Sequence, residues 1–203
     1  MKHNFAPYLK DIMPNILSLA TLKPTMGIEG AGAADLTDVM EEIRPEGEKK
    51  VSIMTDEIEE KDTAIQMLIV FVEELGAGCF DYLEQINTII LGLTQFASSE
   101  NIRTSAAGAL PSLLKCAKEA QPQNIHLIHE LAKQYSNNII EAMDSETETE
   151  CLIAQAEALK DILEEAGQNL LQPASVDQFA DKIFEFIKQS ENRIQGNIEY
   201  EKD

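Results

Sequence analysis

Apolar residues recur at intervals of three and four along most of the chain, which is the period of an amphipathic helix. Between residues 64 and 75 they lie on one face, and Gly76-Ala77-Gly78 then ends the pattern as a helix C-terminal glycine does. No five-residue stretch alternates with the period of two that marks a strand. The pattern therefore predicts an all-α protein.

A second helix is predicted directly after the first. Asp81 can serve as its N-cap, with Glu84 three residues later, which is the spacing of a capping box. The expected buried stripe of this helix comprises Tyr82, Leu83, Ile86, Ile89, Ile90 and Leu93.

The two-helix layout recurs along the chain, which is typical of a repeat architecture. A shift of 42 residues places the apolar positions of 64–75 on those of 106–117, and a further shift of 49 residues carries 107–117 onto 156–166. The expected helix pairs span about 62–96, 101–143 and 147–195.

Two further capping boxes agree with these boundaries. They pair Ser145 with Glu148 and Ser175 with Gln178, each ahead of an apolar stripe.

An isolated helix is predicted at residues 5–22. Its Tyr8-Leu9 aligns with Tyr82-Leu83, so it corresponds to the second helix of a pair whose first helix is missing. A repeat buries its apolar face only against its neighbours, and this half-pair suggests a stretch of a longer solenoid.

A long insertion separates this helix from the first full pair. It holds several glycines, with eleven acidic against three basic residues between Pro24 and Glu60. A loop of this length is usually functional or disordered, and residues Asp35 to Ile43 can form one short helix inside it.

The predicted organisation has five parts. They are the second helix of an incomplete repeat at 1–23, an acidic inserted loop at 24–60, and repeats at 61–98, 99–144 and 145–203, the last with a polar C-terminal tail.

Several segments resemble a known family. The segment from Asn101 to Leu114 has the form of the first helix of a HEAT repeat, with Pro111 where that helix is commonly kinked. The order of Lys61-Asp62-Thr63-Ala64, Tyr82-Leu83-Glu84-Gln85 and Arg103-Thr104-Ser105-Ala106-Ala107 is similar to the middle of importin-beta (karyopherin-beta) receptors, closest to the importin beta-three or importin five branch.

The resemblance covers essentially the whole chain and is strongest over 61–117. It implies an α-α superhelix, a right-handed HEAT-repeat solenoid of antiparallel helix pairs. It also implies that this piece lacks the N-terminal repeats that dominate Ran binding and the C-terminal repeats of the family.

The charge balance narrows the class of partner. Sixteen basic and thirty-six acidic residues give a net charge of −20, which repels phosphate backbones and anionic lipid headgroups. The longest apolar run, Met67 to Val72, is far shorter than the ~18–20 residues that cross a bilayer. We therefore expect no nucleic acid partner and no membrane insertion. A surface this acidic favours basic proteins as ligands, although an acidic balance more often serves only to keep a protein surface solvated.

Catalytic and metal-binding patterns are weak. His126 and His129 lie three apart without the glutamate placement of zinc hydrolases, and the glycine-rich segment 27–32 lacks the strand and the lysine of a phosphate loop. Cys79, Cys116 and Cys151 lie within apolar helical patterns, which predicts buried free thiols in a reducing compartment. We expect no enzyme activity, no cofactor and no metal.

Carboxylates on the second helices are the candidate contacts to a basic ligand, because in solenoids of this type those helices line the concave side. The candidates are Asp81, Glu84, Glu130, Glu141 and Glu185.

The resemblance implies a fragment of a nuclear import receptor that carries basic protein cargo and shuttles between cytoplasm and nucleus. Ran-GTP and nucleoporins would act through the full-length receptor. The alternative is a structural HEAT-repeat scaffold, such as a phosphatase regulatory subunit, which shares the helix pairs without preferring basic ligands.

Overall fold

The computed structural model describes residues 5–22, 26–28, 51–53 and 55–167, and residues 180–191 except 182, 186 and 189. This part of the chain is almost entirely helical, which confirms the predicted fold class. The helices are η1 (Ala6–Tyr8), α2 (Leu9–Ala20), α4 (Thr55–Leu75), η2 (Gly76–Tyr82), α5 (Leu83–Leu93), α6 (Glu100–Ala120), α7 (Ile125–Ser145) and α8 (Thr149–Ala166), where η marks a 3-10 helix.

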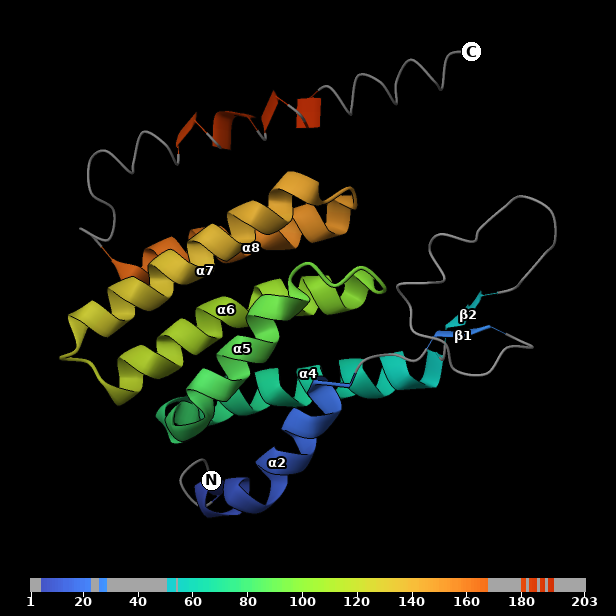
Figure 1. The fold of residues 1–203 in the computed structure, drawn as a ribbon. Coiled ribbons are helices and arrows are strands. Elements are labelled where there is room, and N and C mark those ends of the chain that lie inside the picture. The colour runs from blue at the N-terminus through green and yellow to red at the C-terminus, as the bar shows by residue number, and fades with distance from the viewer. Residues whose placement is uncertain are drawn as a thin grey trace, which may run out of the picture.

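The helices form two layers, as Figure 1 shows. Helices α4, α6 and α8 pack one after another in the first layer, and α2, α5 and α7 lie against them in the second. We call these the first helices and the second helices. The arrangement is that of a solenoid built from antiparallel helix pairs.

The core runs between the two layers along the whole stack. Small residues let α6 approach its neighbours closely, since Ala106, Ala107 and Ala109 are all buried. Larger side chains fill the remaining space, and those almost fully buried include Leu68, Ile86, Leu110, Leu114 and Ile139. The apolar residues that the helical period places on one face of each helix are therefore the residues that pack in the core.

The inserted segment departs from the prediction at both of its described ends. Helix α4 begins at Thr55, inside the range 24–60 that was assigned to the loop. Strands β1 (Met26–Ile28) and β2 (Val51–Ile53) pair antiparallel, with Met26 opposite Ile53 and Ile28 opposite Val51. Three residues are too few for alternation to be read from sequence. The helix predicted at 35–43 and the Ser175–Gln178 capping box lie outside the described residues.

The predicted cap at Asp81 is wrong. Helix α4 ends at Leu75, and Gly76 follows with a φ of 52°, a left-handed conformation that favours glycine. The chain then continues as η2, and Tyr82, not Asp81, stands at the N-cap of α5 with no side-chain cap bond. The Leu83 N–H donates to the Phe80 carbonyl, so the preceding 3-10 helix supplies an acceptor that a cap would otherwise provide.

The predicted cap at Ser145 is also wrong. Ser145 is the last residue of α7, and its hydroxyl donates to the Ala142 carbonyl at 3.4 Å. The carboxylate of Glu146 instead accepts the N–H groups of Thr147 and Glu148 at 2.9 and 3.0 Å.

Two side-chain caps are present that the sequence patterns did not single out. Ser99 accepts the Ile102 N–H at the start of α6, and Asn124 accepts the Leu127 N–H at the start of α7.

One stretch of the described residues, Ile58–Leu93, is long and apolar enough to cross a membrane by length and composition. It is broken by η2 at its centre, and it carries the exposed carboxylates of Glu73 and Glu84. Its Ile65 and Leu68 are fully buried in the core. These features match a helix pair of the solenoid and not a single membrane-spanning helix.

Candidate protein-binding surface on the second helices

Three of the predicted acidic contacts lie on two neighbouring second helices. Glu84 is exposed on α5, and Glu130 and Glu141 are exposed on α7. Asp81 is exposed in η2, just before α5, and Glu185 is exposed among the helical residues that follow α8. Glu84, Glu130 and Glu141 therefore lie along the α5–α7 pair, with Asp81 just before α5 and Glu185 outside the pair.

Buried hydrogen bonds set α5 and α7 in register. The Tyr135 hydroxyl on α7 donates to Asn87 Oδ1 on α5 at 2.6 Å, and Tyr135 is fully buried. Burial raises the pKa of the Tyr135 phenol far above its usual range, although the bond to Asn87 opposes that shift. The phenol is therefore a neutral donor across the physiological range.

A second set of bonds joins the same helices about one turn farther along. The Asn138 side chain donates to the Leu91 carbonyl at 3.2 Å and accepts from the Thr94 hydroxyl at 2.8 Å. The two helices thus run side by side with Asn87 level with Tyr135. Glu84 therefore lies at nearly the same level along the helix axes as Glu130. Glu141 is eleven residues after Glu130, which at ~1.5 Å per residue places it about 16 Å farther along α7.

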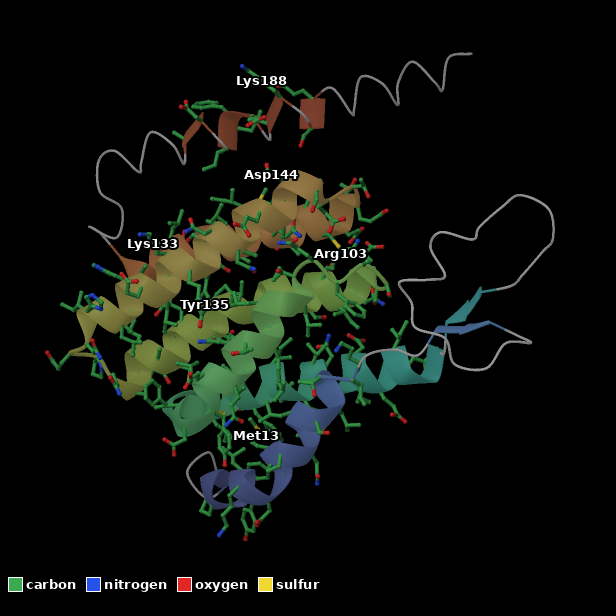
Figure 2. The ribbon with its side chains drawn as sticks, viewed as in Figure 1. Met13, Arg103, Lys133, Tyr135, Asp144 and Lys188 are labelled. Carbon is green, nitrogen blue, oxygen red and sulfur yellow. The ribbon has the colours of Figure 1, made fainter. Side chains whose placement is uncertain are left out.

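A shallow depression of about 360 Å³ adjoins Glu130 on α7. Leu127 and Leu131 supply its apolar part, and Glu130, Lys133, Gln134 and Asn137 supply its polar groups. Lys133 projects from α7 in Figure 2, so this surface combines acidic, amide and basic groups. The search for carboxylates in the sequence missed the two amides. Their positions four and seven residues after Glu130 on one helix are the signal that could have found them.

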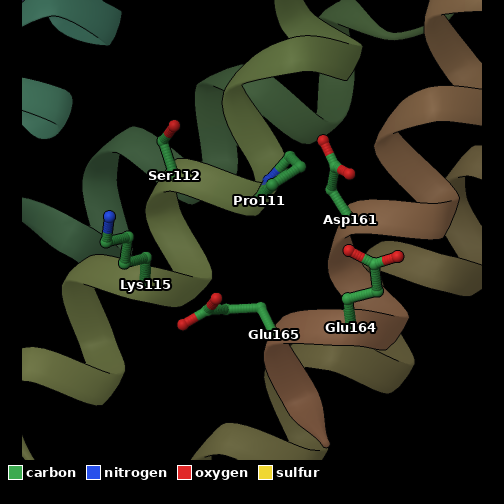
Figure 3. A pocket seen from close by; sticks show the side chains of 6 residues that line it. All are labelled: Pro111, Ser112, Lys115, Asp161, Glu164 and Glu165. Carbon is green, nitrogen blue, oxygen red and sulfur yellow. The ribbon is translucent and has the colours of Figure 1, made fainter.

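A second depression, of about 260 Å³, lies between the first helices α6 and α8 (Figure 3). Pro111, Ser112 and Lys115 line it from α6, and Asp161, Glu164 and Glu165 line it from α8. The Lys118 ammonium binds the Glu165 carboxylate at 3.1 Å and its carbonyl oxygen at 2.7 Å. The Glu165 carboxylate in this depression is thus already paired with Lys118.

The three cysteines are free and buried, as predicted. Burial raises the pKa of Cys79 to about 11 and that of Cys116 to about 12, with Cys79 and Glu119 adding to the second shift. These thiols therefore stay protonated at neutral pH. Within the described ranges, no group of three or more histidine, cysteine or acidic side chains could hold a metal ion.

Comparison with known proteins agrees with the HEAT-type arrangement, although no protein-family model matches the chain. A probable importin-5 homologue of Dictyostelium discoideum is 22% identical over 209 residues, which cover 98% of this chain and 18% of that protein. Crystal structures of Kap121p bound to Ste12p and to Nup53p each match with a TM-score of 0.75 and 20% identity, over 95% of this chain and 19% of Kap121p.

The chain thus spans about one fifth of the length of the proteins it matches. These matches confirm the resemblance to a HEAT-repeat segment of the importin-beta receptors. Importins and karyopherins are transport receptors and not enzymes.

Proposed function

We propose that this chain, which resembles importin-beta receptors in sequence and shares the Kap121p fold, is a segment of a nuclear import receptor. In this proposal it binds basic protein cargo along α5 and α7. Ran-GTP would release the cargo through repeats outside this segment, nucleoporins would bind the longer receptor, and the receptor would shuttle between cytoplasm and nucleus.

The observation that carries the proposal is the pair of second helices locked in register, with Glu84, Glu130 and Glu141 exposed on them. It is supported by the fold match over nearly the whole chain to Kap121p, which was solved in complexes with the proteins Ste12p and Nup53p. Helices held at a fixed spacing present their carboxylates to a ligand without a cost for ordering the backbone, so only the side chains lose freedom on binding.

The mechanism is additive binding by many weak contacts. An exposed ion pair contributes at most about 1 kcal/mol, so affinity for a lysine-rich segment would come from several pairs together. The net charge of −20 attracts basic ligands at long range and speeds association at low salt.

The depression beside Glu130 suits a lysine side chain. Leu127 and Leu131 can cover the aliphatic stem, while the ammonium group reaches the Glu130 carboxylate. Gln134 and Asn137 offer amide groups to the peptide backbone of an extended ligand.

Fluorescence anisotropy with a labelled lysine-rich import segment tests the proposal at two salt concentrations. We expect binding that weakens with salt and falls at least ~10-fold in the double variant Glu84→Lys/Glu130→Lys. The matched control is Glu60→Lys/Glu157→Lys, which makes the same charge change on exposed positions of the first helices α4 and α8.

Equal losses in both double variants would show attraction by net charge alone and would contradict a site on α5 and α7. If neither the chain nor a longer receptor that contains it binds the lysine-rich segment, the proposal of a basic cargo is contradicted.

If that longer receptor retains its cargo in the presence of Ran-GTP, the proposed release by Ran-GTP is contradicted. Capture of a phosphatase catalytic subunit instead would favour the scaffold function.

A further inference from the structure

A buried lysine holds the end of α2 at the point where the inserted segment leaves the solenoid. The Lys61 ammonium donates to the carbonyl oxygens of Ala20 and Leu22 at 2.5 and 2.9 Å. Lys61 is only 4% exposed, and burial lowers the pKa of its ammonium group. A cation at these carbonyls stabilises the C-terminus of α2 through its dipole.

In the next repeat an arginine likewise donates to a backbone carbonyl just after a second helix. Arg103 lies 42 residues after Lys61, the same shift that relates the first helices α4 and α6. Its Nη1 donates to the Phe96 carbonyl at 3.0 Å, in the turn after α5. In the third repeat a further shift of 49 residues falls on Leu152, which carries no charge.

Arg103 also reaches forward to the turn between α7 and α8. Its Nε and Nη2 donate to the two Glu146 carboxylate oxygens at 2.7 and 3.1 Å, a bidentate pair. Burial alone would raise the pKa of Glu146, but the bonds from Arg103 and from the Glu148 and Thr147 N–H groups outweigh burial and lower it. Arg103 lies on the edge of the solenoid where this turn comes together with the turn after α5 (Figures 1 and 2).

Phe96 joins the two cations into one chain of contacts. The Lys61 ammonium lies 5.4 Å from the centre of the Phe96 ring, within the range of a cation–π contact. The carbonyl of the same residue accepts from Arg103. An unbroken path therefore runs from Leu22 through Lys61, Phe96 and Arg103 to Glu146, along one edge of the solenoid.

We infer that this path couples the anchor of the inserted segment to the α7–α8 turn, so that loosening either end loosens the other. The physical reason is that none of its buried charged groups can lose a partner without a large desolvation cost. A shift of one repeat against the next must therefore move Phe96 and carry the neighbouring contact with it. This coupling is independent of what the α5–α7 surface binds.

Amide hydrogen exchange of the 203-residue chain, followed by NMR, tests the coupling in both directions. Glu146→Gln should speed exchange of the Thr21 and Leu22 amides, and Lys61→Met should speed exchange of the Thr147 and Glu148 amides, each by about three-fold or more. Phe96→Leu keeps both charges and most of the apolar volume, and it should speed exchange at both ends.

Two controls separate coupling from general loosening. Asp161→Asn removes the exposed pair with Lys160 and should leave all four amides unchanged. The amides of Asn124, the N-cap of α7, and of Leu127, in the first turn of α7, should keep their rates in every variant.

A change confined to the mutated end would overturn the inference, and so would an equal increase at Asn124 and Leu127. If a charge variant does not fold, Phe96→Leu decides: unchanged exchange at either end of the path contradicts the coupling.

Discussion

Cys79 and Cys116 are ionisable side chains that the described part of the fold almost completely shields from water. Cys79 and Cys116 are at most 1% exposed, and burial raises the pKa of these thiols from 9.0 to about 11 and about 12. The protonated form is therefore favoured in the folded state relative to the unfolded state. Their contribution is fully present below pH 9 and is lost as the pH rises toward 11 and 12.

We expect the free energy of unfolding to fall between pH 9 and 11, by up to about 1.4 kcal/mol per pH unit for each thiol. Cys116→Ala should flatten this slope, because one of the buried groups that ionise in this range is gone. Urea unfolding at several pH values measures the slope. Val72→Ala is the control: it removes buried apolar volume but no thiol, so it should lower stability without changing the slope. An unchanged slope in Cys116→Ala would contradict the proposed contribution of the buried thiols.

A glutamine occupies a core position that is alanine in the preceding repeat. Gln155 lies 49 residues after Ala106 and is fully buried, and neither polar atom of its amide has a hydrogen-bond partner in the described structure. Burying an unpaired amide is unfavourable by roughly 1–3 kcal/mol.

Replacement of Gln155 by methionine, which is similar in size and apolar, should therefore stabilise the protein by about 1 kcal/mol. The exposed Gln95→Met is the control and should be close to neutral. Thermal or urea unfolding followed by circular dichroism compares them. A destabilised Gln155→Met would show that the amide does find a partner.

At the scale of the elements, polar contacts decide how second helices align. Helices α5 and α7 meet through Asn87 with Tyr135 and through Asn138 with Leu91 and Thr94. These bonds have fixed partners, whereas apolar side chains can repack with small shifts. The spacing of the acidic surface is therefore set by the buried Asn87 and the half-buried Asn138.

Asn138→Ala should destabilise the protein by about 1 kcal/mol, since the buried Thr94 hydroxyl and the Leu91 carbonyl each lose one partner and keep the bond to each other. The neighbouring Asn137 is exposed, so Asn137→Ala is a control of the same chemistry on the same helix. Urea unfolding should separate the two variants clearly. Equal effects would mean that the helix register does not depend on these bonds.

At the scale of the whole molecule, exposed apolar side chains gather at the two ends of the stack. Large examples at the first elements are Tyr8, Leu19, Met67 and Val70, and examples at the last elements are Ile153, Ile183, Phe184 and Ile187. Ile125, at the start of α7, is the exception among the exposed large hydrophobic residues of the described chain. The ends of a solenoid need a neighbour or a polar cap, and here they have apolar groups.

We expect the isolated chain to self-associate as salt is raised, because the apolar ends attract while a net charge of −20 repels until it is screened. Light scattering coupled to size-exclusion chromatography from low to 1 M salt measures the mass. Tyr8→Gln/Val70→Gln should reduce association, and Ile125→Gln should not. A monomer of high melting temperature at every salt concentration would contradict this expectation.

The helical period determined the elements because helix formation depends on residues three and four apart. The spacing alone predicted the helix pair 101–143, which the structure has as α6 and α7, and the free buried state of all three cysteines. The resemblance of the segments around Lys61, Tyr82 and Arg103 to importin-beta receptors was likewise readable from the sequence and agrees with the fold.

Only the tertiary structure decided which polar groups meet. Lys61 and Leu22 are 39 residues apart, Arg103 and Glu146 are 43 apart, and Asn87 and Tyr135 are 48 apart. Such pairs depend on how one helix crosses the next, which the pattern within each helix does not specify. The two wrong caps have the same cause, because η2 and Glu146 satisfied the N–H groups for which Asp81 and Ser145 were the local candidates. Local spacing therefore determined the helices, and packing between repeats determined their polar contacts.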